Sequence, residues 1–147
     1  MSVLAPLLIG IGYVLVASLL PEPHRRQLNA VVVAGAGAAY LSGGGFGYAE
    51  LAFTTVVTFC AYRGLGSWRW IGVAWLLHTG ADIAHHQIGQ PIIPAVGQSS
   101  FGCAICDPVI ALWCFAGGPS VYERLSALRG ARSGPGNRRG PRTGTTG

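Results

Sequence analysis

The stretch Trp70–Asp107, WIGVAWLLHTGADIAHHQIGQPIIPAVGQSSFGCAICD, holds most of the chain's chemically active residue types. It begins as an apolar run. Four polar residues then follow in the spacing of one helix: His78, Asp82, His85 and His86. A segment rich in Pro, Gly and Ser comes next and ends in the motif Cys103-x-x-Cys106-Asp107. Because the rest of the chain offers little other chemistry, this stretch decides what function the sequence can predict.

The four polar residues share one face of the predicted helix. At about 100° of rotation per residue, Asp82 lies about 40° to one side of His78, His85 about 20° to the other, and His86 about 80° away. All four side chains therefore fall within an arc of roughly 100°, and a rise of about 1.5 Å per residue spreads them over roughly 12 Å. The spacing predicts one continuous polar face.

The composition is that of a membrane protein. Half of the 147 residues are apolar and 10% are charged, whereas about 25% are charged in typical soluble domains. With a mean hydropathy of +0.45, a soluble domain would expose large apolar patches, so the lipid bilayer is the predicted partner. The net charge of +5 comes from Arg alone, placed near the predicted helix ends and in the tail. This placement argues against nucleic-acid binding.

Five apolar segments predict an all-α polytopic bundle, because about twenty helical residues cross a bilayer. The segments are 2–20, 27–42, 48–62, 70–86 and 107–122. The first lacks the charged start of a signal peptide, so it is counted as a span. Every Arg lies after the first, third or fifth segment. By the positive-inside rule, this alternation places the protein in the cell membrane with its amino terminus outside and its carboxyl terminus in the cytoplasm.

Two further predictions concern the ends and faces of the helices. Residues 1–124 form the predicted transmembrane domain, and residues 125–147 are predicted to be a disordered cytoplasmic tail, rich in Gly, Arg and Pro and too polar to bury a core. Gly117-Gly118-Pro119 predicts a kink in the last helix. Three small residues spaced four apart favour close helix packing and a homo-oligomer through one face: they are Gly35, Ala39 and Gly43.

The predicted topology gathers the polar residues at one end of the bundle. Asp107 and Pro108 have the pattern of an N-cap followed by proline at the first helical position. Glu50 lies near the start of the third predicted helix. Seven polar residues are thus expected at one level, with His78 deeper: Glu50, Asp82, His85, His86, Cys103, Cys106 and Asp107.

Three functions compete with a purely structural polar network. The leading hypothesis is a metal site, since His and Asp one turn apart can chelate one ion and a CxxC motif adds thiolates suited to zinc, copper or iron. Its candidate ligands are His78, Asp82, His85, His86, Cys103 and Cys106, with Glu50 and Asp107 as further polar groups. The alternatives are a small transporter or proton-coupled channel and a membrane thiol-redox protein. An enzyme ranks after these three, since Asp82-Ile83-Ala84-His85-His86 only distantly resembles the His-x-x-His-His box of membrane desaturases.

Several strings resemble a known family. The segments AGAGAAYLSGGGFG, FCAYRGLGSWRWIG, WLLHTGADIAHH and SSFGCAICDPVIALW are similar to a bacterial family of small, uncharacterised multi-pass membrane proteins, a domain-of-unknown-function family. The resemblance covers roughly residues 8–122, and its most distinctive parts are HTGADIAHH and GCAICD. It implies a helical bundle in a membrane, but no activity, cofactor or site residue.

Overall fold

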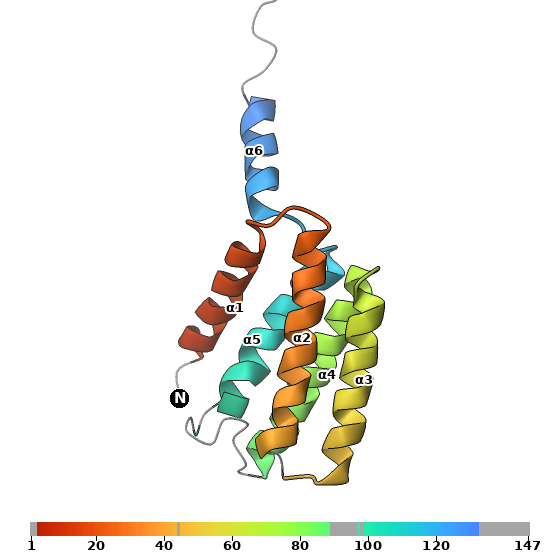
Figure 1. Ribbon diagram of the computed structural model, residues 1–147. Coiled ribbons are helices and arrows are strands. Elements are labelled where there is room, and N and C mark those ends of the chain that lie inside the picture. The colour runs from red at the N-terminus through yellow and green to blue at the C-terminus, as the bar shows by residue number, and fades with distance from the viewer. Residues whose placement is uncertain (1–2, 44, 89–96, 98, 133–147) are drawn as a thin grey trace, which may run out of the picture.

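The computed structural model describes residues 3–43, 45–88, 97 and 99–132, which form six helices and no strand (Figure 1). The helices are α1 (Leu4–Ala17), α2 (His24–Gly43), α3 (Tyr48–Gly64), α4 (Trp68–Gln87), α5 (Ser99–Phe115) and α6 (Val121–Arg132). The all-α class predicted from the sequence is therefore confirmed for the described part of the chain.

Helix α4 is the centre of the bundle. It packs against α2, α3 and α5, while α1 packs against α5. Successive helices from α1 to α5 run in alternating directions, and α6 projects away from the end where α5 finishes (Figure 1). Consequently the carboxyl end of α4 lies at the same end of the bundle as the starts of α3 and α5.

One face of α4 is buried along its whole length. Its first half contributes Ile71, Ala74 and Trp75 to an apolar core that includes residues of α3 and α5. The same face continues with buried polar residues, His78, Asp82 and His85. The helical periodicity found in the sequence is thus the periodicity of burial, and the polar half of the stripe faces neighbouring helices.

The predicted membrane spans are wrong. Among the described residues, no helix combines the length and the apolar character needed to cross a bilayer. Helices α1, α3 and α5 have 14, 17 and 17 residues, short of the roughly twenty that a bilayer requires. Helices α2 and α4 have 20 residues each, but α2 begins with His24-Arg25-Arg26 and α4 carries Arg69, Asp82 and three histidines. The predicted multi-pass location in the cell membrane, with its sidedness, is corrected accordingly.

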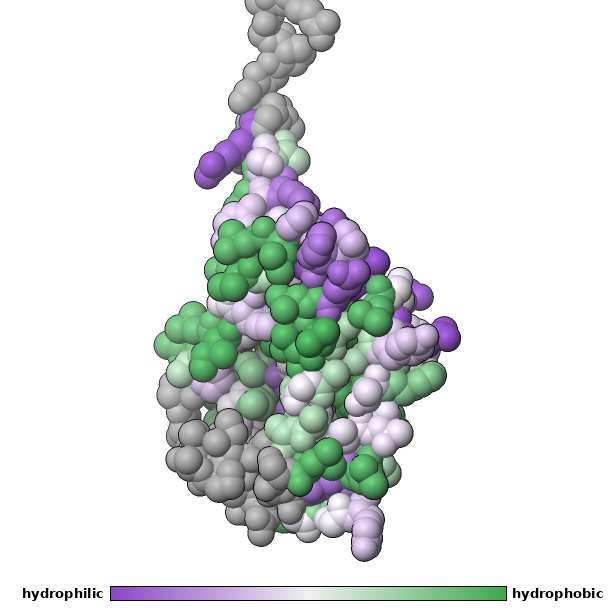
Figure 2. Space-filling view, in the orientation of Figure 1, coloured by the Kyte–Doolittle hydropathy of each residue, from purple (hydrophilic) through white to green (hydrophobic). Residues whose placement is uncertain are grey.

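The Arg-bearing connections nevertheless lie at one end of the bundle. Glu22 links the connection before α2 to the start of α4: its Oε1 accepts a hydrogen bond from Trp68 Nε1 at 3.0 Å and lies 3.4 Å from Arg25 Nε. Arg26 Nε donates to the carbonyl oxygen of Leu65 at 3.0 Å, which joins α2 to the α3–α4 connection. In Figure 2, hydrophilic side chains gather near this end of the visible face, and apolar side chains cover much of the rest.

Helix α5 begins two turns earlier than the sequence predicts. Its first residue is Ser99 rather than Asp107, so Cys103 and Cys106 lie on the helix and Pro108 lies inside it. The helix ends where Gly117 and Gly118 adopt φ angles of 87° and 54°, a left-handed conformation that favours glycine. The predicted kink is therefore a break between α5 and α6.

The structure describes part of the predicted tail and part of the small-residue face of α2. The first part of the predicted tail, residues 125–132, is helical in α6, and residues 133–147 lie outside the described part of the chain. The close approach between α2 and α3 occurs at Gly37, where an added Cβ would lie 2.7 Å from Val57 Cγ1. Gly35 faces open space, and self-association through its face stays a prediction.

Candidate metal centre

Three buried side chains converge where α4 meets α5. His78 Nδ1 lies 2.7 Å from Asp107 Oδ2 and 3.1 Å from Asp82 Oδ2. One ligating atom from each residue lies within 4.8 Å of the other two, and all three residues are buried. Helix α4 supplies His78 and Asp82 from adjacent turns, and α5 supplies Asp107. The arrangement is compact enough for one metal ion to contact all three side chains.

Each carboxylate is oriented by a neighbour that occupies its other oxygen. Tyr40 Oη, from α2, donates to Asp82 Oδ1 at 2.7 Å. The Cys106 thiol donates to Asp107 Oδ1 at 3.2 Å. The Oδ2 atoms of both aspartates are therefore turned towards His78 Nδ1. Such outer hydrogen bonds fix the orientation of ligands in metal sites.

The group has two carboxyl groups for one imidazole. Two carboxylates face a single imidazole nitrogen, so even an imidazolium between two ionised aspartates leaves one net negative charge in a buried site. Burial lowers the pKa of His78, but hydrogen bonds from its Nδ1 to Asp107 and Asp82 outweigh this effect and raise the pKa to about 10. Burial also raises the pKa of Asp82. A doubly charged cation in place of the Nδ1 proton would balance the two carboxylates.

The second nitrogen of His78 is an orphan. Its Nε2 is buried and has no hydrogen-bond partner among the described residues. Buried polar atoms of this kind are uncommon and call for an explanation. A neutral imidazole that binds an ion through Nδ1 must carry its proton on Nε2. The rings of His78 and Trp75 lie 5.9 Å apart between centroids.

His85 forms a separate pair on the same face of α4. Its Nδ1 bonds the carbonyl oxygen of Ala81 at 2.8 Å, and its Nε2 lies 3.2 Å from Glu50 Oε1. The backbone amide of Phe46 also donates to Glu50 Oε1, at 3.0 Å. Glu50 therefore lies beside the carboxyl-terminal half of α4, at the level that the helix order predicts. Both nitrogens of His85 are satisfied here, and His85 is not part of the three-residue group.

The other candidate ligands from the sequence do not join the group. His86 is exposed, and its ring packs against Phe101 with centroids 5.4 Å apart. Cys103 and Cys106 are free thiols of intermediate exposure. Among the described residues, the atoms close enough to share one ion belong to His78, Asp82 and Asp107 alone.

The two thiols of the CxxC motif interact with each other. The neighbouring Cys106 thiol lowers the pKa of Cys103. The neighbouring Cys103 thiol, together with burial and the adjacent Asp107, raises the pKa of Cys106. The pair is thus polarised, with Cys103 the thiol that ionises more readily.

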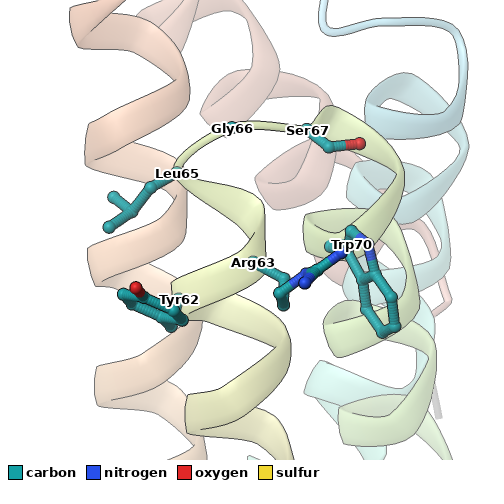
Figure 3. Close-up of a pocket in the computed structure, with 6 residues that line it drawn as sticks. All are labelled: Tyr62, Arg63, Leu65, Gly66, Ser67 and Trp70. Atoms are coloured by element: carbon teal, nitrogen blue, oxygen red, sulfur yellow. The ribbon is translucent and has the colours of Figure 1, made fainter.

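A cavity of about 490 Å³ lies far from this chemistry. It is lined by Tyr62, Arg63, Leu65, Gly66, Ser67 and Trp70, where α3 gives way to α4 (Figure 3). The Arg63 guanidinium lies over the Trp70 ring, 5.5 Å from its centroid. This cavity lies at the amino-terminal end of α4, away from the His78 group. The volume of the cavity is therefore no evidence for the place of the metal site.

Tyr40 was missed as a site residue in the sequence. It ends the run AGAGAAY, in which all the remaining residues are Gly or Ala. A single phenol in such a run is the signal that could have marked it, since a buried Tyr hydroxyl needs a partner.

The fold and the site together define a small all-α protein with a buried His/Asp group able to hold a metal ion. The chain belongs to a family of unknown function, DUF6010, whose model matches residues 1–120. No curated protein and no solved structure matches the chain. The resemblance to an uncharacterised family is therefore confirmed, whereas the match says nothing of a bacterial origin or of membrane spans.

Proposed function

We propose that this protein binds a divalent metal ion through His78, Asp82 and Asp107. The observation that supports this function is the convergence of three ligating atoms within 4.8 Å in a buried site. One imidazole nitrogen and two carboxylate oxygens form a donor set suited to zinc, iron(II) or manganese(II), whereas copper(I) prefers sulfur ligands. The proposal thus keeps the metal hypothesis and replaces four of its six predicted ligands with Asp107.

The number of protein ligands separates a structural role of the ion from a catalytic one. Structural zinc sites use four protein ligands, whereas catalytic sites use three and keep one position for water or substrate. Three ligands from this chain leave such a position. Since the ligands come from α4 and α5, which pack against each other, binding is also expected to stabilise the fold, by an amount that rises with the logarithm of the ion concentration above Kd.

The direct test is metal analysis of the purified protein, followed by calorimetric titration of metal-free protein with Zn²⁺ and with Mn²⁺. We expect one ion per chain, and loss of binding in Asp107→Asn and in Asp82→Asn. His86→Ala is the matched control, because this exposed imidazole should leave binding unchanged. Unfolding curves establish that each variant is folded. No binding by the parent, or binding by both Asn variants as tight as that of the parent, would remove the proposal.

A second candidate function is thiol–disulfide exchange at Cys103 and Cys106. The support is that both thiols are free, that they lie one turn apart on α5, and that Cys106 lowers the pKa of Cys103. In this reaction the Cys103 thiolate attacks a small disulfide and displaces one thiolate. Cys106, after losing its proton, then attacks the Cys103 sulfur and displaces the second. The small disulfide is reduced to two thiols while the pair becomes a disulfide.

Mass spectrometry after incubation with oxidised glutathione tests this candidate. The expected product has lost two hydrogen atoms, and Cys106→Ser should stop at the mixed disulfide. Unmodified protein under these conditions would exclude the exchange.

A further inference from the structure

A smaller cavity lies beside the second histidine–carboxylate pair. Its volume is about 160 Å³, and it opens between the start of α3 and the end of α4. Its walls include Phe46, Phe53, Ala81 and Ala84, and the Glu50–His85 pair forms its polar end. An apolar protein cavity of about 150 Å³ is large enough to bind benzene. The space therefore suits a single aromatic ring.

The polar end of this cavity is net neutral. A carbonyl oxygen can only accept a hydrogen bond, so the 2.8 Å contact with Ala81 requires a proton on His85 Nδ1. The 3.2 Å contact between Nε2 and Glu50 Oε1 then requires one more proton between those two atoms. Whichever atom holds that proton, the pair has no net charge. A charged ligand would be left uncompensated against apolar walls, which disfavours it.

The carboxyl group of Glu50 lines the cavity. Its Oε1 accepts from the Phe46 amide and faces His85 Nε2. We expect a donor that enters the cavity to bind this carboxyl group. Glu50 itself is 7% exposed, so the hydrogen bond would form in a largely dry environment, where a partner is worth more than in water.

The walls favour an aromatic ligand. The ring of Phe46 meets that of His85 edge to face, with centroids 4.8 Å apart and an interplanar angle of 89°. Phe53 packs in the same manner on Tyr40, at 4.9 Å and 76°. Aromatic groups arranged in this way offer faces and edges to a further ring.

From these features we propose that the cavity binds a small neutral aromatic molecule that carries one hydroxyl group, the phenol class. The ring occupies the space between Phe46 and Phe53, and the hydroxyl donates to Glu50. This site is distinct from the three-residue metal group and does not depend on it.

The test is calorimetric titration of metal-free protein with phenol, with toluene and with benzoate. Toluene has a similar shape but no donor, and benzoate is charged. Phenol is expected to bind about tenfold more tightly than either, since a hydrogen bond to a carboxyl group contributes on the order of 1.5 kcal/mol. Equal affinities for phenol and toluene, or no binding of phenol, would overturn the proposal.

Two matched variants locate the binding. Ala49 lines the cavity and Ala52 does not, although both are exposed on α3. Ala49→Leu should remove phenol binding by filling the opening, and Ala52→Leu should leave it unchanged. Equal phenol binding by both variants would contradict this location. Asp107→Asn should bind phenol as the parent does, so a failure of the metal proposal remains distinguishable from a failure here.

Discussion

Helix α4 presents two histidines on one buried face, and they differ in how their charge is balanced. His85 is 2% exposed and His78 is 4% exposed. His85 has one carboxylate and a backbone carbonyl, so both nitrogens are satisfied. His78 has two carboxylates on a single nitrogen and none on the other. The two sites therefore differ in the ratio of carboxylates to imidazoles rather than in residue type. One carboxylate balances His85, whereas two carboxylates beside His78 favour a bound cation.

The largest expected effect comes from breaking the self-sufficient pair. His85→Ala leaves Glu50 buried without its partner, which should lower the free energy of unfolding by about 3 kcal/mol. Urea unfolding of metal-free protein measures this. Removing Glu50 as well, in the double variant with Glu50→Ala, should recover part of the loss because no unpaired carboxyl group remains. A single variant as stable as the parent would show that the pair is not buried as described.

The second prediction concerns pH at the other histidine. With a pKa of about 10, His78 holds a proton on Nδ1 at neutral pH, and an incoming ion must displace it. Metal affinity should therefore rise about tenfold per pH unit between roughly pH 6 and pH 8, with proton release. Calorimetry in buffers of different ionisation enthalpy detects that release. Affinity independent of pH would contradict ligation by His78 Nδ1.

The same raised pKa of His78 makes the free energy of unfolding of the metal-free protein depend on pH. The folded-state value lies above the ordinary value of 6.5, so the stabilisation is complete below about pH 6.5 and is lost as the pH rises towards 10. Asp107→Asn removes one of the two carboxylates responsible and should flatten this dependence.

A smaller effect is expected from the outer hydrogen bond to Asp82. Tyr40→Phe keeps the ring that packs on both histidines, with centroids 5.0 Å from His78 and 4.7 Å from His85. It removes the hydroxyl that orients Asp82, so metal affinity should fall about tenfold. Tyr48→Phe is the matched control because Tyr48 is 94% exposed. An equal change in both variants would show that Tyr40 does not orient the ligand.

The smallest effect is expected at the thiols. Cys106→Ser retains a donor for Asp107 and should leave metal affinity nearly unchanged, whereas loss of binding would make Cys106 a ligand. Cys103, whose pKa is lowered, should react first with a maleimide in the folded protein, and Cys106, whose pKa is raised, more slowly. The buried Cys60 and Cys114 should react only after unfolding. Labelling followed by peptide mapping distinguishes the two pairs.

The sequence predicted what depends on local periodicity. The buried face of α4 repeats with the helical period, so His78, Asp82 and His85 could be placed together from spacing alone. Alternating helix directions then brought Glu50 to the level of His85. Both inferences need only helices and their order, and neither depends on a bilayer.

What the sequence could not supply depends on packing between helices. Asp107-Pro108 has the pattern of a helix start, yet α5 continues through it from Ser99, with Ser99 and Ser100 buried. Those two turns carry Asp107 into the helix interior and opposite His78. A low content of charged residues favours a membrane protein, but helix length and the position of the charged residues decide whether a segment can cross a bilayer.

The most direct test of the metal site is X-ray absorption spectroscopy of the zinc-loaded protein. Ligation by His78, Asp82 and Asp107 predicts a first shell of nitrogen and oxygen atoms at about 2.0–2.2 Å, with no sulfur. A sulfur shell at about 2.3 Å would place Cys103 or Cys106 on the ion and contradict the account, as would the absence of a histidine signature.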